Sequence, residues 1–552
     1  MYWAVAKVSL QSSPHYQTYE HLLSDGWLLA RKVDNSDSQY ASFRENVPYL
    51  ALLVVIHPLL RRAYERFSGI TARPSSTTNA SVKPSVADTA AHARRRLQSR
   101  LTYDFFFALV FTFALHGFSA LKVLLILYIN FRLATSLPRN YIPAASWIFN
   151  ISILFANELA HGYPLAAVVS TLLPSLPAAA QAAEFLDSHS GLISRWDVLF
   201  NITVLRLISF NLDYYWSLNS AGSRSASPIE KKQLDPSSLS ERDRVSIPAP
   251  AVHFTSLPTY LAYTLYSPLY LAGPILTFND YISQSTYPAP SLCVRRTTLY
   301  GIRFLLTFLC MEFVLHTIYV VAISKSDPDW STYTPFQLSM LAYFNLHIIW
   351  LKLLIPWRFF RLWALIDGID PPENMVRCMS DNYSGLAFWR SWHRSYNRWI
   401  VRYIYIPLGG GPGGGTSMPR GLLNMVLVFT FVALWHDINL RLLAWGWLVV
   451  LFILPEVLAG LAFPAKAWRH RPTTYRVICG IGAVANVLMM MAANLVGFAL
   501  GLDGLKGLVQ GIISSWQGAL FMVAACAALF VGVQVMFEHR EEEKRKGIRM
   551  KC

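Results

Sequence analysis

The sequence predicts an all-α polytopic integral membrane protein. Of its 552 residues, 54% are hydrophobic and only 14% are charged, whereas soluble domains average about 25% charged residues. Apolar runs close to the ~20 residues that cross the hydrocarbon layer recur along the chain. We therefore expect about 10–12 membrane spans, with some of the shorter runs forming re-entrant elements.

The expected spans follow one another with few interruptions. They centre near residues 48–60, 103–131, 141–180, 198–218, 255–278, 298–323, 335–356, 422–436, 440–463, 475–501 and 512–537. The run 141–180 is long enough for two crossings of ~20 residues each. Hydrophobic periodicity does not distinguish a short span from a re-entrant element.

Basic residues lie in the loops between these runs. The net charge of +16 is therefore better explained by the positive-inside bias of membrane proteins than by nucleic-acid binding. Residues 61–100 are rich in Ser, Thr, Ala, Pro and Arg, which predicts a disordered cytosolic linker that touches anionic lipid. The glycosylation sequon that begins at Asn79 lies in this linker, so we expect it to be unmodified.

We expect one integral-membrane domain built from consecutive segments. These are the N-terminal segment with the first span (1–60), the basic linker (61–100), N-terminal spans (101–219), a hydrophilic loop (220–254), a helical core (255–538) and a charged, cytosolic tail (539–552). An even number of spans between the linker and the tail would place both on one side of the membrane. The N-terminus, which precedes the first span, would then lie on the opposite side. The six cysteines show no paired spacing and no CxxC motif, so we expect neither a disulfide framework nor a metal site.

One histidine is predicted to lie at membrane depth. The uncharged run 426–435 leads directly to His436. Because a low-dielectric setting disfavours charge, we expect a neutral imidazole, the form that a general base requires. Acyl transfer from a thioester to a hydroxyl needs such a base, together with a group that steadies the oxyanion. The alternative is a histidine that only caps the carbonyls at a helix end.

A second histidine, His393, lies in a stretch rich in Trp and Arg, residues 388–402. Trp and Arg favour the headgroup level, which predicts an interfacial helix. Within this stretch an arginine occurs at every fourth position: Arg390, Arg394, Arg398 and Arg402. On one helix they would form a stripe, and guanidinium groups in a stripe would hold the phosphates of acyl-CoA. Anchoring to lipid headgroups, with His393 as an ordinary interfacial residue, is the alternative.

The apolar run 255–278 contains Gly273-Pro274, which should break a helix. A membrane tolerates such a break only where the backbone is buried in protein or lines a cavity. An ordinary kinked span is the alternative.

These stretches resemble the membrane-bound O-acyltransferase family. The match is closest to its glycerol-uptake-protein branch, fungal remodelling acyltransferases of glycosylphosphatidylinositol (GPI) anchors that are related to hedgehog acyltransferase. The resemblance rests on four segments: 388–399 (FWRSWHRSYNRW), 433–437 (ALWHD), 266–281 and 37–44. It implies a helical core with an acyl tunnel.

The resemblance also implies roles for individual residues. His436 is the expected catalytic base, and His393 faces the same tunnel, where it orients or polarises the donor carbonyl. The break at Gly273-Pro274 becomes a re-entrant element that lines the tunnel. Residues expected to contact donor or substrate are Arg390, Arg394, Arg398, Trp392, Trp435, Asn397, and, near the tunnel mouth, Asn279 and Tyr281.

The function so implied is that of an O-acyltransferase in the endoplasmic reticulum membrane, with the plasma membrane as a second location. Long-chain acyl-CoA is the co-substrate, and we expect no further cofactor, no metal and no nucleic acid. The implied acceptor is the sn-2 hydroxyl of lyso-GPI anchors, which makes membrane lipids and lyso-GPI-anchored proteins the partners. A secreted protein's N-terminus is another acceptor compatible with the same mechanism.

Two alternatives belong to other functional classes. A glycerol or solute transporter would carry paired broken helices in two matching halves, and only the break at Gly273-Pro274 is strong. An acyltransferase-like regulator without catalysis is the other, and the presence of both His393 and His436 argues against it.

Overall fold

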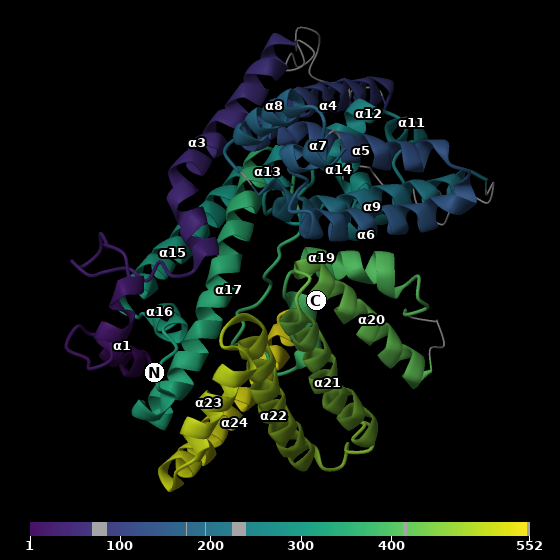
Figure 1. The fold of residues 1–552 in the computed structure, drawn as a ribbon. Helices are drawn as coiled ribbons and strands as arrows, with labels where there is room; N and C mark the ends of the chain where they lie inside the picture. The colour runs from purple at the N-terminus through teal and green to yellow at the C-terminus, as the bar shows by residue number, and fades with distance from the viewer. Residues whose placement is uncertain (69–85, 173, 194, 223–238, 412–416, 549–552) are drawn as a thin grey trace. The chain divides into compact units, whose positions relative to one another are not determined.

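The computed structural model describes residues 1–68, 86–172, 174–193, 195–222, 239–411 and 417–548. Helices joined by turns make up these segments, and no β-strand occurs within them (Figure 1). The all-helical, polytopic prediction is therefore confirmed. The sequon at Asn79 and the centre of the predicted linker lie outside the described residues.

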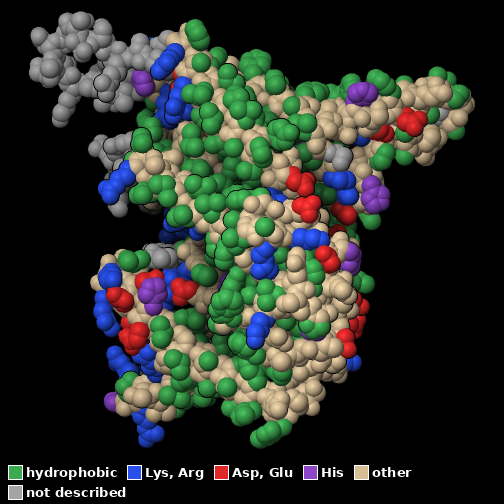
Figure 2. All heavy atoms as spheres, turned by 90° about the vertical axis from the view of Figure 1, so that its left-hand side faces the viewer, with side chains coloured by type: hydrophobic (Ala, Val, Ile, Leu, Met, Phe, Trp, Pro, Cys, Tyr) green, Lys and Arg blue, Asp and Glu red, His purple; other side chains and the backbone are tan. Residues whose placement is uncertain are grey.

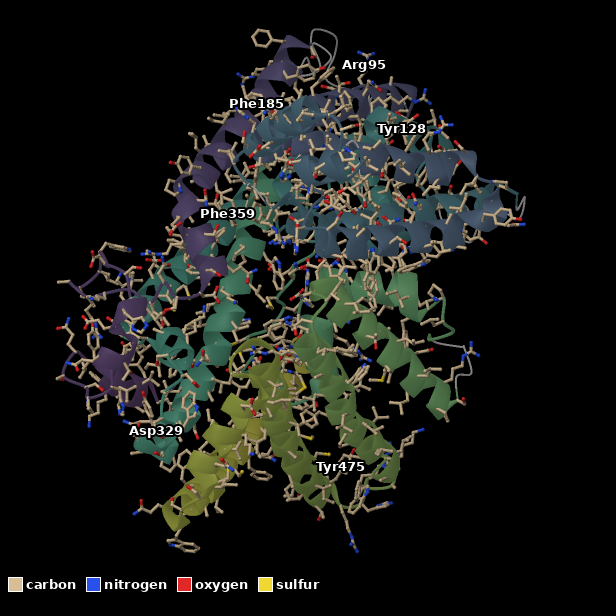
Figure 3. The ribbon with its side chains drawn as sticks, viewed as in Figure 1. Arg95, Tyr128, Phe185, Asp329, Phe359 and Tyr475 are labelled. Atoms are coloured by element: carbon tan, nitrogen blue, oxygen red, sulfur yellow. The ribbon has the colours of Figure 1, made fainter. Side chains whose placement is uncertain are left out.

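Nine helices in the described ranges are long and apolar enough to cross a membrane. They are α3 (Ser38–Phe67), α5 (Ser119–Ser136), α6 (Ile142–Leu159), α15 (Val294–Thr317), α17 (Pro335–Ile366), α20 (Met418–His436), α21 (Leu440–Ala462), α22 (Pro472–Phe498) and α24 (Trp516–Arg545). Their exposed side chains are largely apolar, as lipid contact requires. Figure 2 shows such side chains over the face that includes α3, and Tyr128 of α5, labelled in Figure 3, is one of the exposed residues.

The chain forms two compact units. Unit 1 comprises residues 1–47, 302–358 and 373–552, and unit 2 comprises residues 48–301 and 359–372. Unit 1 includes the whole of the spans α20, α21, α22 and α24, and unit 2 includes the whole of α5 and α6. Unit 1 also contains α1 (Tyr2–Val8), α2 (Tyr16–Tyr19), α16 (Val320–Lys325), α18 (Gly385–Ser391), α19 (Arg394–Ile400) and α23 (Gly501–Ile513). Unit 2 adds α4 (Val86–His116), α7 (Leu165–Leu172), α8 (Pro177–Ser188), α9 (Trp196–Gly222), α10 (Glu241–Ser246), α11 (Ala251–Phe254), α12 (Leu257–Thr264), α13 (Ser267–Tyr270) and α14 (Phe278–Thr286).

Several predicted boundaries are wrong. The run 103–131 is two helices, α4 and α5, because the chain turns at Gly117, where φ is +52° and a Cβ would lie 2.0 Å from the His189 carbonyl oxygen. The ends of the predicted linker are helical, since α3 continues to Phe67 and α4 begins at Val86. The predicted hydrophilic loop likewise contains α10 and α11. The charged tail is helical to Arg545, and its Glu543 forms an ion pair with Arg377.

The break at Gly273-Pro274 is confirmed. Residues 271–277 are not helical, and the run 255–278 forms the short helices α12 and α13 instead of a span. A Cβ at Gly273 would lie 2.5 Å from the Leu269 Cα, so this close approach needs glycine. The buried Arg206 guanidinium donates to the carbonyl oxygens of Thr264, at 2.9 Å, and Leu269. The two carbonyls that precede the break thus have partners within the protein, as irregular backbone at membrane depth requires.

A buried ionic cluster ties the helices of unit 2 together. The Asp367 carboxylate accepts from Arg61 Nε, at 2.6 Å, from Arg100 and from the Tyr266 hydroxyl. Arg100 Nε also lies 3.3 Å from the Asp104 carboxylate. His57 approaches Asp367 as well, so three potential metal ligands meet here. Two guanidinium groups already balance the two carboxylates, which accounts for this cluster as an ion-pair network.

We predict that Asp367→Asn strongly destabilises the protein, because two buried guanidinium groups lose their shared counter-charge. Removing one partner of a buried pair costs about 3–5 kcal/mol. The matched control is Asp329→Asn, an exposed carboxylate that accepts from the Ser331 N–H (Figure 3). Thermal unfolding in detergent should show a large fall in Tm for the first variant and little change for the second; equal shifts would contradict the role assigned to the cluster.

Candidate active site

His436 is the last residue of α20. The chain then turns through Asp437 and Asn439, whose side chain accepts from the Arg441 N–H at 2.9 Å, and α21 begins at Leu440. Helices α20, α21 and α22 pack in succession within unit 1 (Figure 1). His436 is exposed, whereas Trp435 before it is buried. The position at the helix end leaves the imidazole accessible, and its location at membrane depth stays a prediction.

His393 sits at a break between two short helices. α18 ends at Ser391, Trp392 is extended, and α19 begins at Arg394. His393 itself has φ 44° and ψ 53°, the left-handed conformation, which costs roughly 1–2 kcal/mol for a residue with a Cβ. Asn374 holds the turn, because its carbonyl oxygen accepts from the Arg394 N–H at 3.0 Å and its Oδ1 accepts from the Ser395 N–H at 3.1 Å.

Aromatic rings bring the two histidines into one cluster. His393 stacks on Trp357, with ring centroids 4.3 Å apart and an interplanar angle of 27°. The Trp435 ring is a neighbour of both histidines, with its centroid 6.3 Å from the His393 ring and 4.8 Å from the His436 ring. Further rings complete the surroundings: Tyr396 beside His393, and Trp445 and Phe498 beside His436. The two predicted residues therefore share one aromatic cluster, although His393 lies between α18 and α19 and His436 ends α20.

Neither imidazole has a hydrogen-bond partner among the residues that the structure describes. Burial lowers the pKa of His393 to about 3, and the nearby His436 acts in the same direction. A neutral imidazole presents one N–H donor and one nitrogen acceptor. The pair can therefore accept a proton at one ring and donate a hydrogen bond from the other, which are the two functions that acyl transfer needs.

The predicted arginine stripe is wrong. The left-handed turn at His393 separates Arg390, on α18, from Arg394 and Arg398, on α19. Arg402 lies in a π-helical turn, residues 401–405, where the wider i→i+5 pattern changes the angular step. A four-residue spacing therefore does not align these side chains on one face. Arg390 and Arg398 are exposed, and Arg402 lies over the Tyr403 ring.

The remaining predicted contact residues divide between the two units. In unit 1, Trp392 stacks on Phe388 with centroids 5.3 Å apart, Asn397 is partly exposed on α19, and Trp435 belongs to the aromatic cluster. The prediction for Asn279 and Tyr281, in unit 2, does not fit. Both are buried, and their polar atoms bond within the unit.

The Asn279 amide accepts from the Ala249 N–H at 3.0 Å and donates to the Val245 carbonyl oxygen at 3.3 Å. The Tyr281 hydroxyl donates to Asp104 at 2.6 Å. These residues stabilise unit 2 and offer no free polar group to a substrate. Conversely, Trp357 and Asn374 support His393, and no motif in the sequence distinguishes them from other Trp and Asn residues.

Comparisons with known proteins agree on one family of proteins. The sequence profile of MBOAT, the membrane-bound O-acyltransferase family, matches residues 175–502. The chain is 45% identical to Membrane-bound O-acyltransferase GUP1 of Candida tropicalis, covering 100% of this chain and 86% of that protein. It is 44% identical to Membrane-bound O-acyltransferase GUP1 of Saccharomyces cerevisiae, covering 100% and 90%. Protein-cysteine N-palmitoyltransferase HHAT of Mus musculus is 31% identical over 35% of this chain and 38% of its own length.

Two substitutions at His393 should separate its backbone from its imidazole. His393→Gly relieves the left-handed conformation, whereas His393→Ala keeps it strained. We predict equal loss of catalytic activity but a free energy of unfolding about 1 kcal/mol higher for the glycine variant, and therefore a higher Tm. Activity assays and thermal unfolding of the purified variants test this. Full activity in either variant would exclude a catalytic imidazole, and a less stable glycine variant would exclude the strained turn.

Proposed function

Because this chain belongs to the membrane-bound O-acyltransferase family and is a multi-pass O-acyltransferase, we propose that it transfers a long-chain acyl group from acyl-CoA to a lipid hydroxyl. His436 and His393 carry the reaction in this proposal. The observation that supports the assignment most is the accessible imidazole of His436 at the end of α20. It has no hydrogen-bond partner in the described part of the chain and shares Trp435 with a second imidazole.

His436 acts as the general base. Its unprotonated ring nitrogen removes the proton of the acceptor hydroxyl while that oxygen attacks the thioester carbonyl carbon. The new C–O bond gives a tetrahedral oxyanion, and the C–S bond then breaks. The proton on His436 passes to the leaving CoA sulfur, so the imidazole ends neutral. No acyl-enzyme forms, because the acceptor attacks the donor directly.

His393 stabilises the oxyanion. Its neutral ring donates one N–H toward the carbonyl oxygen as negative charge develops there. Stacking on Trp357 and the left-handed turn fix the ring in place. A donor held in position in a water-poor site stabilises developing charge more than a mobile one, because little reorganisation accompanies the reaction.

The acceptor in this proposal is the free sn-2 hydroxyl of a lyso-GPI anchor on a protein, acylated in the endoplasmic reticulum membrane. Support comes from the similarity over the whole chain to the two fungal relatives and from the branch-like segments 37–44 and 388–399. Cells that lack the protein should accumulate lyso-GPI anchors on lipid analysis. Normal anchors together with altered glycerol uptake would favour a transporter instead.

We predict that His436→Ala lowers acyl transfer by about 10²–10⁴-fold, the usual contribution of a general base. His393→Ala should lower it strongly but less completely, since it assists without accepting the proton. The double variant should lose far less than the product of the two separate losses, because residues that act together are not additive. Assays of the purified proteins, and GPI lipid analysis of deficient cells that express each variant, test this.

The matched control is His347→Ala in the same unit. The His347 ring already bonds to the Ser380 hydroxyl at 2.6 Å and to the Tyr343 carbonyl oxygen at 2.8 Å. It has no described contact with His393 or His436, so its loss should affect stability more than turnover. A folded His436→Ala protein that restores normal GPI lipids would overturn the catalytic assignment.

A second experiment addresses the donor. If the exposed Arg398 and the half-buried Arg394 hold the phosphates of acyl-CoA, Arg398→Ala and Arg394→Ala should raise the donor KM and leave kcat at saturating donor nearly unchanged. Because the arginines do not form one stripe, Arg390→Ala on α18 should behave independently of the two α19 variants. Unchanged KM with poorer membrane insertion would assign these arginines to headgroup anchoring.

A further inference from the structure

A carboxylate within the spanning helix α21 receives four hydrogen bonds and has no cationic partner among the described residues. Glu456, which follows Pro455, accepts from the Ser384 hydroxyl and from the Gly385 N–H at 2.9 Å. It also accepts from the Leu386 N–H at 3.3 Å and from the Asn486 amide of α22 at 2.8 Å. Three of these four donors belong to the first turn of α18 or to its N-cap.

The contacts explain why an acidic residue is tolerated in a membrane span. An ionisable side chain at membrane depth is expensive unless it is paired, and such residues tend to mark functional sites. The first N–H groups of a helix have no partner inside the helix and form its positive end. Glu456 supplies the missing acceptors for α18, so the carboxylate and the helix start satisfy one another.

α18 depends on such contacts because it has only seven residues. Helices of this length are not stable on their own in water. Its N-terminus fits closely against the spans, since a Cβ at Gly385 would lie 3.4 Å from both a Glu456 oxygen and the Met490 sulfur. Further along, Trp389 meets the Trp445 ring at 5.6 Å. Trp445 is in turn a neighbour of His436.

The far end of α18 leads directly to His393. Seven helical residues extend about 10 Å, after which Trp392 and the left-handed His393 follow. On the other side of His393, Asn374 Oδ1 accepts a hydrogen bond from the Ser395 N–H at the start of α19. The histidine therefore lies between two anchored points, and Glu456 is the anchor on the α18 side.

We propose that Glu456 is a positioning residue that places His393 by fixing the start of α18 on α21 and α22. It has no described contact with either histidine ring, so it takes no part in the chemistry itself. The inference rests on the proposed function, in which His393 stabilises the oxyanion. Glu456, a carboxylate within a span, thus has a role in catalytic geometry that its position in the sequence does not indicate.

The test compares Glu456→Gln with Glu312→Gln. Glu312, on α15 of the same unit, is also a carboxylate within a span, and it pairs with Arg44 at 2.8 Å and accepts from Trp27 Nε1 at 3.0 Å. Both variants lose a carboxylate charge within a span, half-buried at Glu456 and buried at Glu312, but only the first disturbs α18. We expect Glu456→Gln to lower kcat by about 10- to 100-fold per folded protein, as misplacement of a catalytic group does, with the donor KM little changed. Glu312→Gln should keep kcat.

Combining Glu456→Gln with His393→Ala distinguishes a positioning role of Glu456 from a purely structural one, because the two roles predict different kcat values for the double variant. If Glu456 acts through His393, Glu456→Gln should cause no further loss of kcat in the His393→Ala background. Independent, multiplicative losses would overturn the proposal. Hydrogen–deuterium exchange adds a measurement without catalysis: residues 385–395 should exchange faster in Glu456→Gln only. If that variant fails to accumulate, Asn486→Ala, which removes one of the four donors, takes its place.

The outcomes also separate this inference from the proposed function. Full activity of His393→Ala would overturn the oxyanion role of His393, and with it the catalytic meaning of Glu456, whatever the exchange data show. An inactive His393→Ala protein, together with full kcat and unchanged exchange in Glu456→Gln, would overturn the positioning role alone.

Discussion

Hydrocarbon offers no hydrogen bonds, so every polar group buried at membrane depth needs a partner within the protein. This constraint accounts for the main departures from regular helix. In unit 2, Arg206 satisfies the carbonyls beside the break at Gly273-Pro274, and Arg61 and Arg100 neutralise Asp367. In unit 1, Glu456 satisfies the start of α18. Each of these three features is matched by a partner from another helix.

The two imidazoles depart from this pattern. Their neighbours are aromatic rings, and within the described ranges no donor or acceptor occupies their nitrogens. His436 is accessible at the end of a spanning helix, and His393 is held in a strained turn. Strain of this kind persists only where surrounding contacts impose it, and it concentrates at functional sites. Unsatisfied ring nitrogens beside a fixed turn are what a base and an oxyanion donor require before substrate binds.

Features with a physical cause in nearby residues could be predicted from the sequence. The uncharged run before His436 places this residue at a helix end, and Gly273-Pro274 breaks its helix because both residues oppose helical continuation. The turn at His393 could not be predicted, since arginines spaced by four residues imitate a continuous helix and histidine carries no strong signal for the left-handed conformation. The sequence also could not show that Asn279 and Tyr281 are bonded within unit 2, because their partners lie far away along the chain.

If acyl transfer takes place at His436 and His393, the donor must bind beside both imidazoles. An experimental structure of the purified protein with a non-hydrolysable acyl-CoA analogue tests this. We expect the analogue's carbonyl group to lie beside both rings, with its oxygen within about 3.2 Å of an imidazole nitrogen of His393. A fully occupied analogue whose carbonyl lies away from both histidines would contradict it.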